Sequence, residues 1–515
     1  MMSSVQASLR YIFSAQGLVL SVAAFVGYWI CWIIYARNFH PLCNVPGPWL
    51  ASVSRLWYLR QVARGDMEHT QRRLHAQYGP LLRIAPNEIA CASPDEIKKV
   101  YRNSGALDKT DFYTVWNSQN FSKHRDMFTT LNDKEHGERR RIFNHVYSLS
   151  NVLKSEEYID KCSEMFIKRI AREEGSTKPF DLGKWLQMYA FDVIGELYFG
   201  NAFGFLATGG DHGDWIGSLD LLLPFLCATA VAPSYIRPLI LASALVVPGS
   251  LKALKAIDNI GVSARRCVAE RFDKTSQNKE TRRTDILEQL YEIHQEKGEK
   301  VDFQLGDIQQ EAYVALFAGS DTTAIGFRSV LYHLMKTPEA YKQLLQEIDD
   351  AADRGELSSP VKYAEAIKLP YLCACIKEAL RVHPGVALTM ARIVPREGLE
   401  LCGTYIPAGY RVGMNGAVIH YDKSVFGDDA DQYRPGRWLE GDTSKMDKCM
   451  LHFGAGTRTC IGKNISIAEI HKLIPYLLRN FQVDLWEPEK KWTTRNSWFN
   501  KQEGLEVRVT ARGSK

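Results

Sequence analysis

The sequence has 515 residues, 45% hydrophobic and 24% charged, which is ordinary globular usage and permits a large buried core. Its formal net charge of +5 is small for this length and argues against nucleic acid as a main partner. Its eleven cysteines are odd in number and never spaced Cys-x-x-Cys, which indicates reduced thiols rather than a disulfide framework or a zinc site.

The first predicted element is a transmembrane anchor at residues 17–35, preceded by a short flank, 1–16. This stretch carries no charged side chain, and as a helix it would span about 28 Å, nearly the thickness of a bilayer core. Aromatic residues crowd its C-terminal half, as they do at membrane interfaces. Basic residues are more frequent after the span than before it, which keeps the rest of the chain in the cytosol. A proline-rich hinge, 36–50, follows.

Residues 51–515 are predicted to form one large, mainly helical domain with one small β-sheet region. Residues 271–301 are highly charged, so we expect them to be solvated and partly loop, and residues 420–452 are expected to be irregular. Helical periodicity predicts helices over 66–78, 305–336, 338–354, 363–382, from near 460, and between about 135 and 200 with a polar break at 173–178. Alternation predicts strands within 81–93, within 391–416 and after 481.

Residues 219–249 form the second most apolar stretch of the chain. Four prolines and Arg237 interrupt it, which argues against a second membrane span. Two interpretations stand: a buried part of the core, or an interfacial segment that dips into the bilayer.

A glycine-rich loop near the C-terminus carries the strongest chemical signal. Glycines at three positions let the backbone approach a flat, bulky group closely. The arginine offers a forked cation to an anion, and the cysteine lies at the start of the predicted helix, where backbone amides favour thiolate. Such a thiolate suits an iron centre. The loop reads Phe453-Gly454-Ala455-Gly456-Thr457-Arg458-Thr459-Cys460-Ile461-Gly462.

Weaker patterns precede this loop. The helix predicted at 305–336 contains Ala318-Gly319-Ser320-Asp321-Thr322-Thr323, poor helix formers whose hydroxyls can bond carbonyls one turn back and open the helix. Glu378 and Arg381 can pair at i, i+3, and a segment Tyr433-Arg434-Pro435-Gly436-Arg437-Trp438 follows. His136 and Arg140 share a helix face that is otherwise readable as a basic, solvated surface.

Taken together and in this order, these motifs resemble those of the cytochrome P450 family. Phe-x-x-Gly-x-Arg-x-Cys-x-Gly is matched at every fixed position, and the Asp-Thr motif is matched without departure. Tyr433 stands where Phe is common, Gly436 where Glu is common, and His136 where Trp is common. The resemblance covers essentially the whole chain, including the anchor and the hinge. Residues 121–141 and 421–439 are similar to fungal members near the pisatin demethylase group.

The resemblance implies roles for individual residues. Cys460 would be the axial ligand of the iron of haem b, held in a loop that also contributes Phe453, Gly454, Gly456 and Gly462. Thr322 and Asp321 would be catalytic, through oxygen binding and proton relay. The residues expected to reach the haem propionates are His136, Arg140, Arg392 and Arg458; those expected to form a buried structural lock are Glu378, Arg381 and Arg437. The expected substrate-pocket positions are Ala315, Ala318, Val386, Ala387 and Leu388, with parts of 107–121 and 496–500.

The resemblance also implies the reaction and the partners. The expected function is a haem-thiolate monooxygenase that oxidises a lipophilic small molecule in fungal secondary metabolism, using O2 and electrons from NADPH. The electrons would come through NADPH-cytochrome P450 reductase, with cytochrome b5 as an optional second partner. A basic face of Arg139, Arg141, Lys448 and Lys463 is the expected reductase site. The expected location is the endoplasmic reticulum membrane, single-pass, with a cytosolic catalytic domain and no nucleic acid partner.

Two other functions remain open. A haem-thiolate isomerase or dehydratase would act without O2 or reductase, but would have no need of Asp321 and Thr322. A non-catalytic haem sensor would need neither the oxygen motif nor a membrane entrance. The apolar pocket positions indicate a lipophilic substrate without identifying it.

Overall fold

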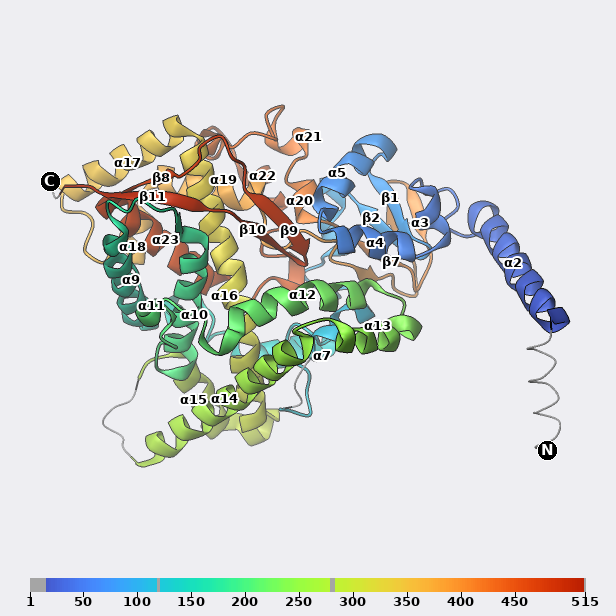
Figure 1. The fold of residues 1–515 in the computed structure, drawn as a ribbon, viewed down its shortest axis with the longest axis horizontal. Helices are drawn as coiled ribbons and strands as arrows, with labels where there is room; N and C mark the ends of the chain where they lie inside the picture. The colour runs from blue at the N-terminus through green and yellow to red at the C-terminus, as the bar shows by residue number, and fades with distance from the viewer. Residues whose placement is uncertain (1–14, 118–120, 278–282, 514–515) are drawn as a thin grey trace.

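The computed structural model describes residues 15–117, 121–277 and 283–513. The chain is mainly α-helical, with a helical body from which the N-terminal helix α2 projects (Figure 1). The α-helices are α2 (Ala15–Asn38), α3 (Trp49–Val53), α4 (Leu56–Arg64), α5 (Met67–Tyr78), α6 (Ile97–Val100), α7 (Asp133–Phe143), α8 (Leu149–Val152), α9 (Glu156–Ile170), α10 (Leu182–Phe199), α11 (Phe205–Thr208), α12 (Trp215–Val231), α13 (Arg237–Ser243), α14 (Ser250–Gln277), α15 (Ile286–Val301), α16 (Leu305–Lys336), α17 (Pro338–Asp353), α18 (Tyr363–Ala366), α19 (Pro370–Val382), α20 (Gly416–Ile419), α21 (Lys423–Phe426), α22 (Ser444–Cys449) and α23 (Lys463–Asn480).

The helices follow the predicted pattern with two exceptions. The predicted helix 363–382 is divided into α18 and α19, because Pro370 lacks a backbone N–H and begins a new helix at its first position. Residues 271–301 were expected to be partly loop. In the described part of this range they are mostly helical, in α14 and α15, because α15 buries an apolar face on the core beneath its charged one. Residues 278–282 lie outside the described part.

Within the described residues the strands form four small sheets, not the single one expected. Their orders are β1-β2-β7-β4, β3-β11-β8, β10-β9 and β5-β6. All pairings are antiparallel except β2 with β7, which is parallel. Strands far apart in the chain pair here, and alternation along one strand cannot reveal its partner. The strands are β1 (Leu81–Ala85), β2 (Glu88–Cys91), β3 (Phe180–Asp181), β4 (Arg392–Ile393), β5 (Leu399–Leu401), β6 (Thr404–Ile406), β7 (Arg411–Gly413), β8 (Phe481–Leu485), β9 (Thr493–Ser497), β10 (Phe499–Glu503) and β11 (Glu506–Ala511).

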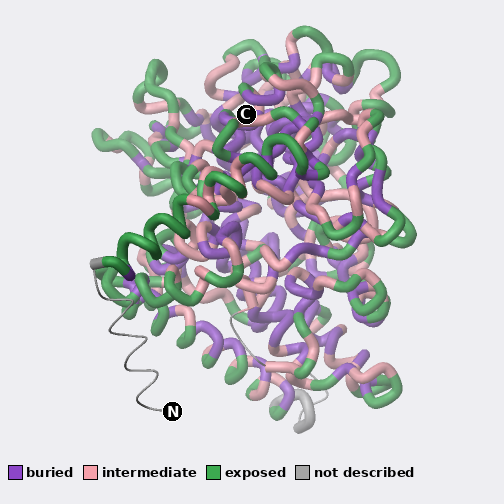
Figure 2. The backbone as a smooth tube through the Cα atoms, turned by 90° about the vertical axis from the view of Figure 1, so that its right-hand side faces the viewer, coloured by how far each residue is buried: buried purple, intermediate pink, exposed green. Residues whose placement is uncertain are grey.

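Helix α16 is the central element of the body. It packs against α10, α14, α15, α17, α19 and α23 and also touches β8 and β10. The largest apolar core cluster surrounds it and includes Phe191, Phe327, Leu331 and Leu473. The tube through the middle of the body is accordingly mostly buried, whereas α2 is mostly exposed (Figure 2). A side chain on α16 is therefore held rigidly from several directions.

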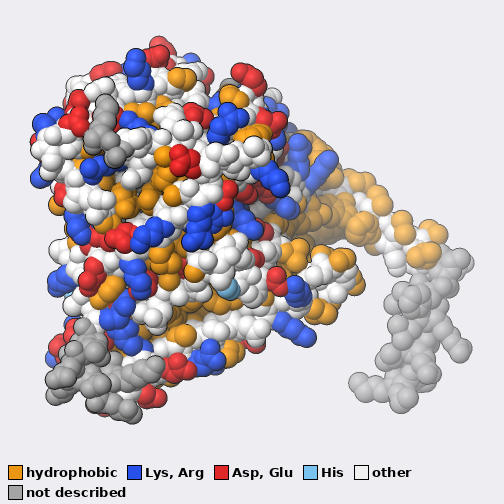
Figure 3. Space-filling view, turned by 60° about the vertical axis from the view of Figure 1, so that its left-hand side comes forward, with side chains coloured by type: hydrophobic (Ala, Val, Ile, Leu, Met, Phe, Trp, Pro, Cys, Tyr) orange, Lys and Arg blue, Asp and Glu red, His pale blue; other side chains and the backbone are white. Residues whose placement is uncertain are grey.

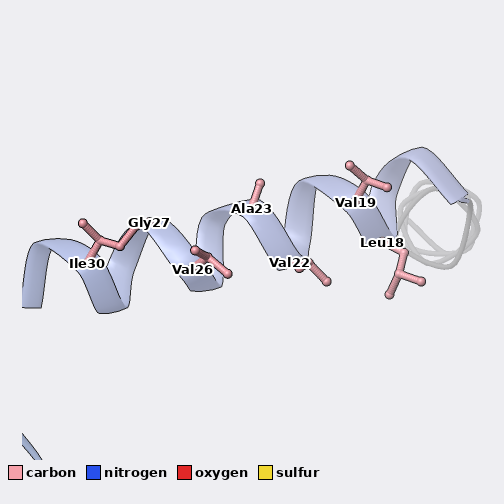
Figure 4. Close-up of a pocket in the computed structure, with 7 residues that line it drawn as sticks. All are labelled: Leu18, Val19, Val22, Ala23, Val26, Gly27 and Ile30. Atoms are coloured by element: carbon pink, nitrogen blue, oxygen red, sulfur yellow. The ribbon is translucent and has the colours of Figure 1, made fainter.

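Helix α2 exposes apolar side chains along its length. The span Gln16–Asn38 has a mean hydropathy of 2.1 and is 6% buried over its most apolar window. Hydrophobic side chains cover the projecting helix (Figure 3), and a shallow apolar hollow on it is lined by residues between Leu18 and Ile30 (Figure 4). Such a surface is unfavourable in water and is typical of a membrane anchor.

The connection after α2 is attached to the body by a buried arginine. Arg83 of β1 donates to the carbonyl oxygens of Ala36 (3.0 Å) and Leu42 (3.2 Å) and lies 2.9 Å from Nδ1 of His40. Burial and the nearby Arg83 charge lower the pKa of His40 to about 4. The imidazole is therefore neutral at physiological pH, when it accepts the hydrogen bond from Arg83.

The described residues contain a second helix that is long and apolar enough to cross a membrane, His212–Val231, and a bent helix pair, Ser234–Val246 with Ser250–Asp273, that passes the same test together. His212–Val231 is 44% buried over its most apolar window, and α12 within it contains Pro224. The segment between α12 and α14 exposes several large apolar side chains: Tyr235, Leu239, Leu241, Leu245, Val246, Leu251 and Leu254.

Candidate functional site

The cysteine loop is held in shape by short backbone contacts. The amide of Cys460 donates to the carbonyl oxygen of Phe453 (2.8 Å). Gly454 and Gly456 have φ of +72° and +67°, a region that favours glycine. A Cβ at Gly456 would lie 2.4 Å from the carbonyl oxygen of Arg102, so the close approach here is to the chain itself. Gly462 has no such constraint, because a Cβ there would meet nothing within 4 Å.

Backbone amides near Cys460 favour its thiolate, as expected, but desolvation opposes them. Helix α23 begins at Lys463, with Gly462 as its N-cap, so Cys460 precedes the helix rather than beginning it. Hydrogen bonds from the amides of Gly462 and Lys463 and the charge of Arg140 lower the pKa of the thiol, but desolvation by the surrounding protein outweighs them and raises it. The side chain is nevertheless exposed to approach. A coordinated metal ion, which deprotonates a thiol outright, would be needed to hold the thiolate.

A cluster of buried basic side chains lies beside this loop. It comprises Arg392, Arg458, Arg140, His136 and Lys109, of which Arg392, Lys109 and His136 are buried and the other two half-buried. Burial and the neighbouring arginines lower the pKa of His136 to about 2, and burial together with Arg392 and Arg458 lowers the pKa of Lys109 well below its usual value. The cations thus disfavour one another's charged forms, and the carboxylates of Asp126 and Asp133 offset this only in part.

Backbone carbonyls fix the orientation of the three arginines. Arg140 donates to the carbonyl oxygens of Thr457 (3.1 Å) and Thr459 (2.7 Å), which attaches α7 to the cysteine loop. Arg458 donates to the carbonyl oxygens of residues 130 and 131 at 2.7 and 2.9 Å. Arg392, at the start of β4, donates to the hydroxyl of Tyr113 (3.2 Å) and to two nearby carbonyls.

The cluster fits a dianionic group such as haem with its two propionates. Buried Nδ1 of His136 and Nε of Arg458 have no hydrogen-bond partner within the protein, and buried polar groups of this kind are normally paired. Asp133 lies 3.6 Å from Arg458 Nε, beyond hydrogen-bond range. Two carboxylates placed here would pair these atoms and balance the buried charge.

Lys109 also belongs to this cluster, and no motif in the sequence indicated it. Its Nζ donates to the carbonyl oxygen of Phe128 (2.7 Å) and lies over the rings of Tyr113 and Phe128. Residue 109 forms a β-bridge with Arg392, nearly three hundred positions later in the chain. In the sequence, Lys109 falls within the range 107–121 that is expected to line the substrate pocket.

The oxygen motif lies on α16, which remains a continuous helix through it. Thr322 Oγ1 donates to the carbonyl oxygen of Ala318 (2.6 Å), and Ser320 Oγ donates to that of Leu316 (2.6 Å). This is the predicted bonding to the preceding turn. Ala318 is exposed and Thr322 half-buried, although the next turns of the helix are fully buried, so this part of α16 borders open space.

Asp321 points to the other side of the same turn and is buried. Its Oδ1 accepts a short hydrogen bond from Nε2 of Gln187 on α10. Arg328 donates to Gln187 Oε1 (3.1 Å), and this fixes the amide so that its NH2 group faces Asp321. Desolvation raises the pKa of Asp321, opposed by the charge of Lys501. Neither Gln187 nor Lys501 was identified from the sequence.

The structure brings Glu378, Arg381 and Arg437 together in the interior. Glu378 accepts from Arg381 at 2.8 and 2.7 Å and from Arg437 at 2.9 Å. It also accepts from Trp438 Nε1 (2.9 Å) and from the amide of Arg434 (3.0 Å). All three charged side chains are at most 2% exposed. The carboxylate thus joins α19 to the segment before the cysteine loop.

The expected pocket positions differ in how far they are buried. Ala315 and Val386 are half-buried and Ala318 is exposed, whereas Ala387 and Leu388 are fully buried. A Cβ at Gly385 would lie 3.8 Å from the Thr322 carbonyl oxygen, so this segment adjoins the oxygen motif. Val386 forms a β-bridge with Phe499, which brings the 496–500 range beside it. Residues 118–120 of the other range lie outside the described residues.

The expected basic face loses one member. Arg139 is buried and binds Asp307 at 2.6 Å and the carbonyl oxygen of Asp302 at 2.7 Å, because on α7 it turns toward the helix that follows α15. Arg141, Lys448 and Lys463 are exposed.

Comparisons with known proteins agree with one another. The Cytochrome P450 family model matches residues 46–508. The cytochrome P450 monooxygenase gsfF of Penicillium aethiopicum is 46% identical over 98% of this chain and 100% of its own length. The cytochrome P450 monooxygenase cicH of Emericella nidulans is 34% identical over 96% of this chain and 99% of its own. A pisatin demethylase of Fusarium vanettenii is 32% identical over 98% of this chain and 95% of its own.

Proposed function

The chain belongs to the cytochrome P450 family and is a monooxygenase of that family, and on this premise we propose that it oxidises a lipophilic small molecule of fungal secondary metabolism. The observation that carries the proposal is the exposed Cys460 beside a buried cluster of cations whose charges nearby carboxylates offset only in part. The fungal sources of the similar proteins, one of them a pisatin demethylase, support the metabolic assignment.

The residues around Cys460 would hold haem b. Haem bound through a cysteine sulfur supplies oxygen activation that no protein side chain can provide. Cys460 would be the axial ligand, and Arg140, Arg392, Arg458 and His136 would bind the propionates, joined by Lys109. Phe453, Gly454 and Gly456 would keep the loop in register, the two glycines through their positive φ.

Thr322 and Asp321 would bind oxygen and move protons. The Thr322 hydroxyl donates to a carbonyl of its own helix, which leaves its oxygen lone pairs free to accept a hydrogen bond on the open side. Burial raises the pKa of Asp321 above its usual value, which suits a carboxyl group that accepts and donates protons. This pair is the reason to prefer a monooxygenase over an isomerase, a dehydratase or a haem sensor.

The substrate would lie against the exposed part of α16, at Ala315, Ala318 and Val386. Ala387 and Leu388 would position Val386 through the packed backbone around them: the Ala387 carbonyl accepts from Asn415 (2.8 Å) and Asn496 (2.7 Å). Small, apolar side chains on this surface fit a bulky lipophilic molecule.

Electrons would come from NADPH through a separate NADPH-cytochrome P450 reductase, with cytochrome b5 as a second possible donor of electrons. Arg141, Lys448 and Lys463 are the exposed basic side chains near the cysteine loop that would face an acidic partner. We expect reversal of two of these charges to raise the reductase concentration needed for half-maximal rate.

The catalytic domain, residues 51–515, would be held on the cytosolic side of the endoplasmic reticulum by α2, with 36–50 as hinge. We propose a single span: Pro224 and the partial burial of α12 argue against a second. The exposed apolar side chains between Tyr235 and Leu254 would dip into the bilayer beside the substrate entrance.

Truncation tests the interfacial contact. Deleting residues 1–34 removes most of α2 but keeps Ala36 and His40, which Arg83 binds. We expect the truncated protein to sediment with neutral phospholipid vesicles, and to lose this affinity when Leu239 and Val246 are both changed to Glu. A truncated protein without lipid affinity would refute the contact.

Spectroscopy tests the haem assignment. Cys460→Ser should abolish the red-shifted band of the reduced carbon-monoxide complex, while Cys449→Ser, a buried cysteine before the loop, should retain it. NADPH-dependent oxygen uptake with added reductase separates a monooxygenase from the two alternatives. Spectral shifts against a panel of fungal terpenoids, alkaloids and polyketides would then identify the substrate class.

A further inference from the structure

Lys501 connects the catalytic acid to the helix over it. Its Nζ forms a short ion pair with Asp220 Oδ1 on α12 and lies 3.9 Å from Asp321 Oδ1 on α16. Lys501 itself comes from β10, which touches α16, while β9 of the same hairpin touches α12 (Figure 1). One cation is therefore placed between two carboxylates from different helices.

The three side chains form a gradient of exposure from solvent to interior. Asp220 is 44% exposed, Lys501 17% and Asp321 2%. The Coulomb interaction of Lys501 with the buried Asp321 is weakly screened, whereas the interaction with Asp220 is partly screened by water. Lys501 is thus within reach of the catalytic acid but is held at a longer distance by its closer partner.

The other neighbours of Asp321 do not offer it a mobile positive charge. Gln187 of α10 is neutral and donates one hydrogen bond. Arg328 lies further along α16 and directs its guanidinium to the Gly183 carbonyl oxygen (3.0 and 2.7 Å) and to Gln187. The charges acting on Asp321 are Lys501 and Arg328, which favour its carboxylate, and Asp220, which opposes it.

We propose that Lys501 is a positioning residue that sets the charge of Asp321, and that Asp220 competes with Asp321 for it. With Lys501 held by Asp220, Asp321 keeps a higher proton affinity and is available as a proton donor. If α12 withdrew Asp220, Lys501 would be free to form a direct ion pair with Asp321 and hold it as a carboxylate. The position of α12 is thereby coupled to proton delivery. This inference rests on the proposed role of Asp321 in the monooxygenase.

The proposal predicts opposite effects from two neighbouring substitutions. Lys501→Met removes the cation and should raise the pH at which Asp321 loses its proton. Asp220→Asn frees the cation and should lower that pH. A charge at this distance shifts a carboxyl pKa by about 1 unit or more. Lys501→Arg should retain the wild-type profile, since it restores the charge.

Thermal unfolding of the full-length, haem-loaded protein between about pH 5 and pH 8 measures the shift in the Asp321 pKa without any turnover. A carboxyl whose pKa is raised by folding adds stability below its unfolded pKa and loses it as the pH rises. Relative to wild type, Lys501→Met should therefore be increasingly destabilised toward high pH, and Asp220→Asn should be increasingly stabilised toward high pH. Adding Asp321→Asn to either variant should remove its pH-dependent difference.

The matched control is Lys252→Met, which removes an exposed ion pair with Asp214 at the start of α12 and should leave the pH profile unchanged. Parallel profiles for wild type and Lys501→Met, shifts of both variants in one direction, or failure of Lys501→Arg to restore the profile would each overturn the proposal.

A second measurement addresses catalysis. With reductase and NADPH, the fraction of consumed oxygen released as hydrogen peroxide should change with pH at a higher midpoint in Lys501→Met and a lower one in Asp220→Asn. If the protein consumed no oxygen, the proposed function would fail, while the unfolding experiment would still decide the coupling of Lys501 with Asp321.

Discussion

Changing Glu378 to Gln tests how strongly one buried carboxylate stabilises the region before the cysteine loop. The two oxygens of Glu378 accept five hydrogen bonds, three at Oε1 and two at Oε2. Glutamine keeps the shape of the Glu378 side chain, but its NH2 group cannot accept a hydrogen bond. It will occupy the Oε2 position, where it displaces the donors of Arg381 (2.8 Å) and Trp438 (2.9 Å) rather than three donors at the other oxygen.

The cost follows from the bonds that are lost. Hydrogen bonds to charged groups contribute about 1.5–3 kcal/mol each, so two lost bonds cost about 3–6 kcal/mol. The same change leaves Arg381 and Arg437 buried without their common anion, and breaking a buried pair costs about 3–5 kcal/mol. The two figures describe one effect and agree. Either is a large part of the about 5–15 kcal/mol that stabilises a typical native protein.

Urea unfolding of the full chain, followed by far-UV circular dichroism together with haem absorbance, measures the loss. The control is Glu440→Gln. Glu440 pairs with Arg434 at 2.7 Å but its side chain is 62% exposed, so its loss should cost less than about 1 kcal/mol. We expect Glu378→Gln to unfold at much lower urea and to release haem early. Equal midpoints for the two variants would refute the reasoning.

Three further predictions concern the loop, the cation cluster and the core. Gly456→Ala should lower the free energy of unfolding by at least about 1–2 kcal/mol, because φ is +67° and its Cβ would meet Arg102 O at 2.4 Å. Gly462→Ala, whose Cβ would meet nothing within 4 Å, is the control in the same unfolding assay. Equal losses of stability in the two variants would contradict the steric argument. Lys109→Met should weaken haem retention about tenfold or more in transfer to apomyoglobin, as loss of one charge-assisted bond requires; unchanged retention would remove Lys109 from the site. Burial raises the pKa of Glu469 well above its usual value, and neither oxygen has a partner within the protein. Its stabilising contribution is therefore present below about pH 4.5 and lost as the pH rises. Glu469→Gln should raise the Tm at pH 8 more than at pH 5, and an equal gain at both would exclude titration.

Much of the helical framework was predictable because it is local. The helix 305–336 coincides with α16, and 66–78 lies within one residue of α5. The division at Pro370 shows the limit of such local prediction. The apolar periodicity continues across Pro370, but proline has no backbone N–H to donate, so the helix does not. The helix at 286–301 carries many charges on one face, and these obscure in the sequence the apolar stripe that the other face buries.

The candidate site likewise combines residues that local spacing predicts with residues that only tertiary packing brings together. Cys460, Arg458 and the glycines fall in one short loop, so their spacing alone indicates their arrangement. Lys109, by contrast, reaches the cation cluster through a β-bridge to Arg392. Arg139 and Arg141 are two positions apart on one helix, yet one is buried against Asp307 and the other exposed. Only the packing of α7 on the body decides between them.

By itself, the sequence determined the helical class, the apolar N-terminal helix, the family and the order of the motifs, because each is written in residues near one another along the chain. Tertiary structure decided which distant polar and charged groups meet: Lys109 with the arginines, Gln187 and Lys501 with Asp321, Trp438 with Glu378. It also showed that desolvation outweighs the local amides at Cys460. Burial and electrostatic coupling depend on every segment folded around a group, so no local pattern can give them.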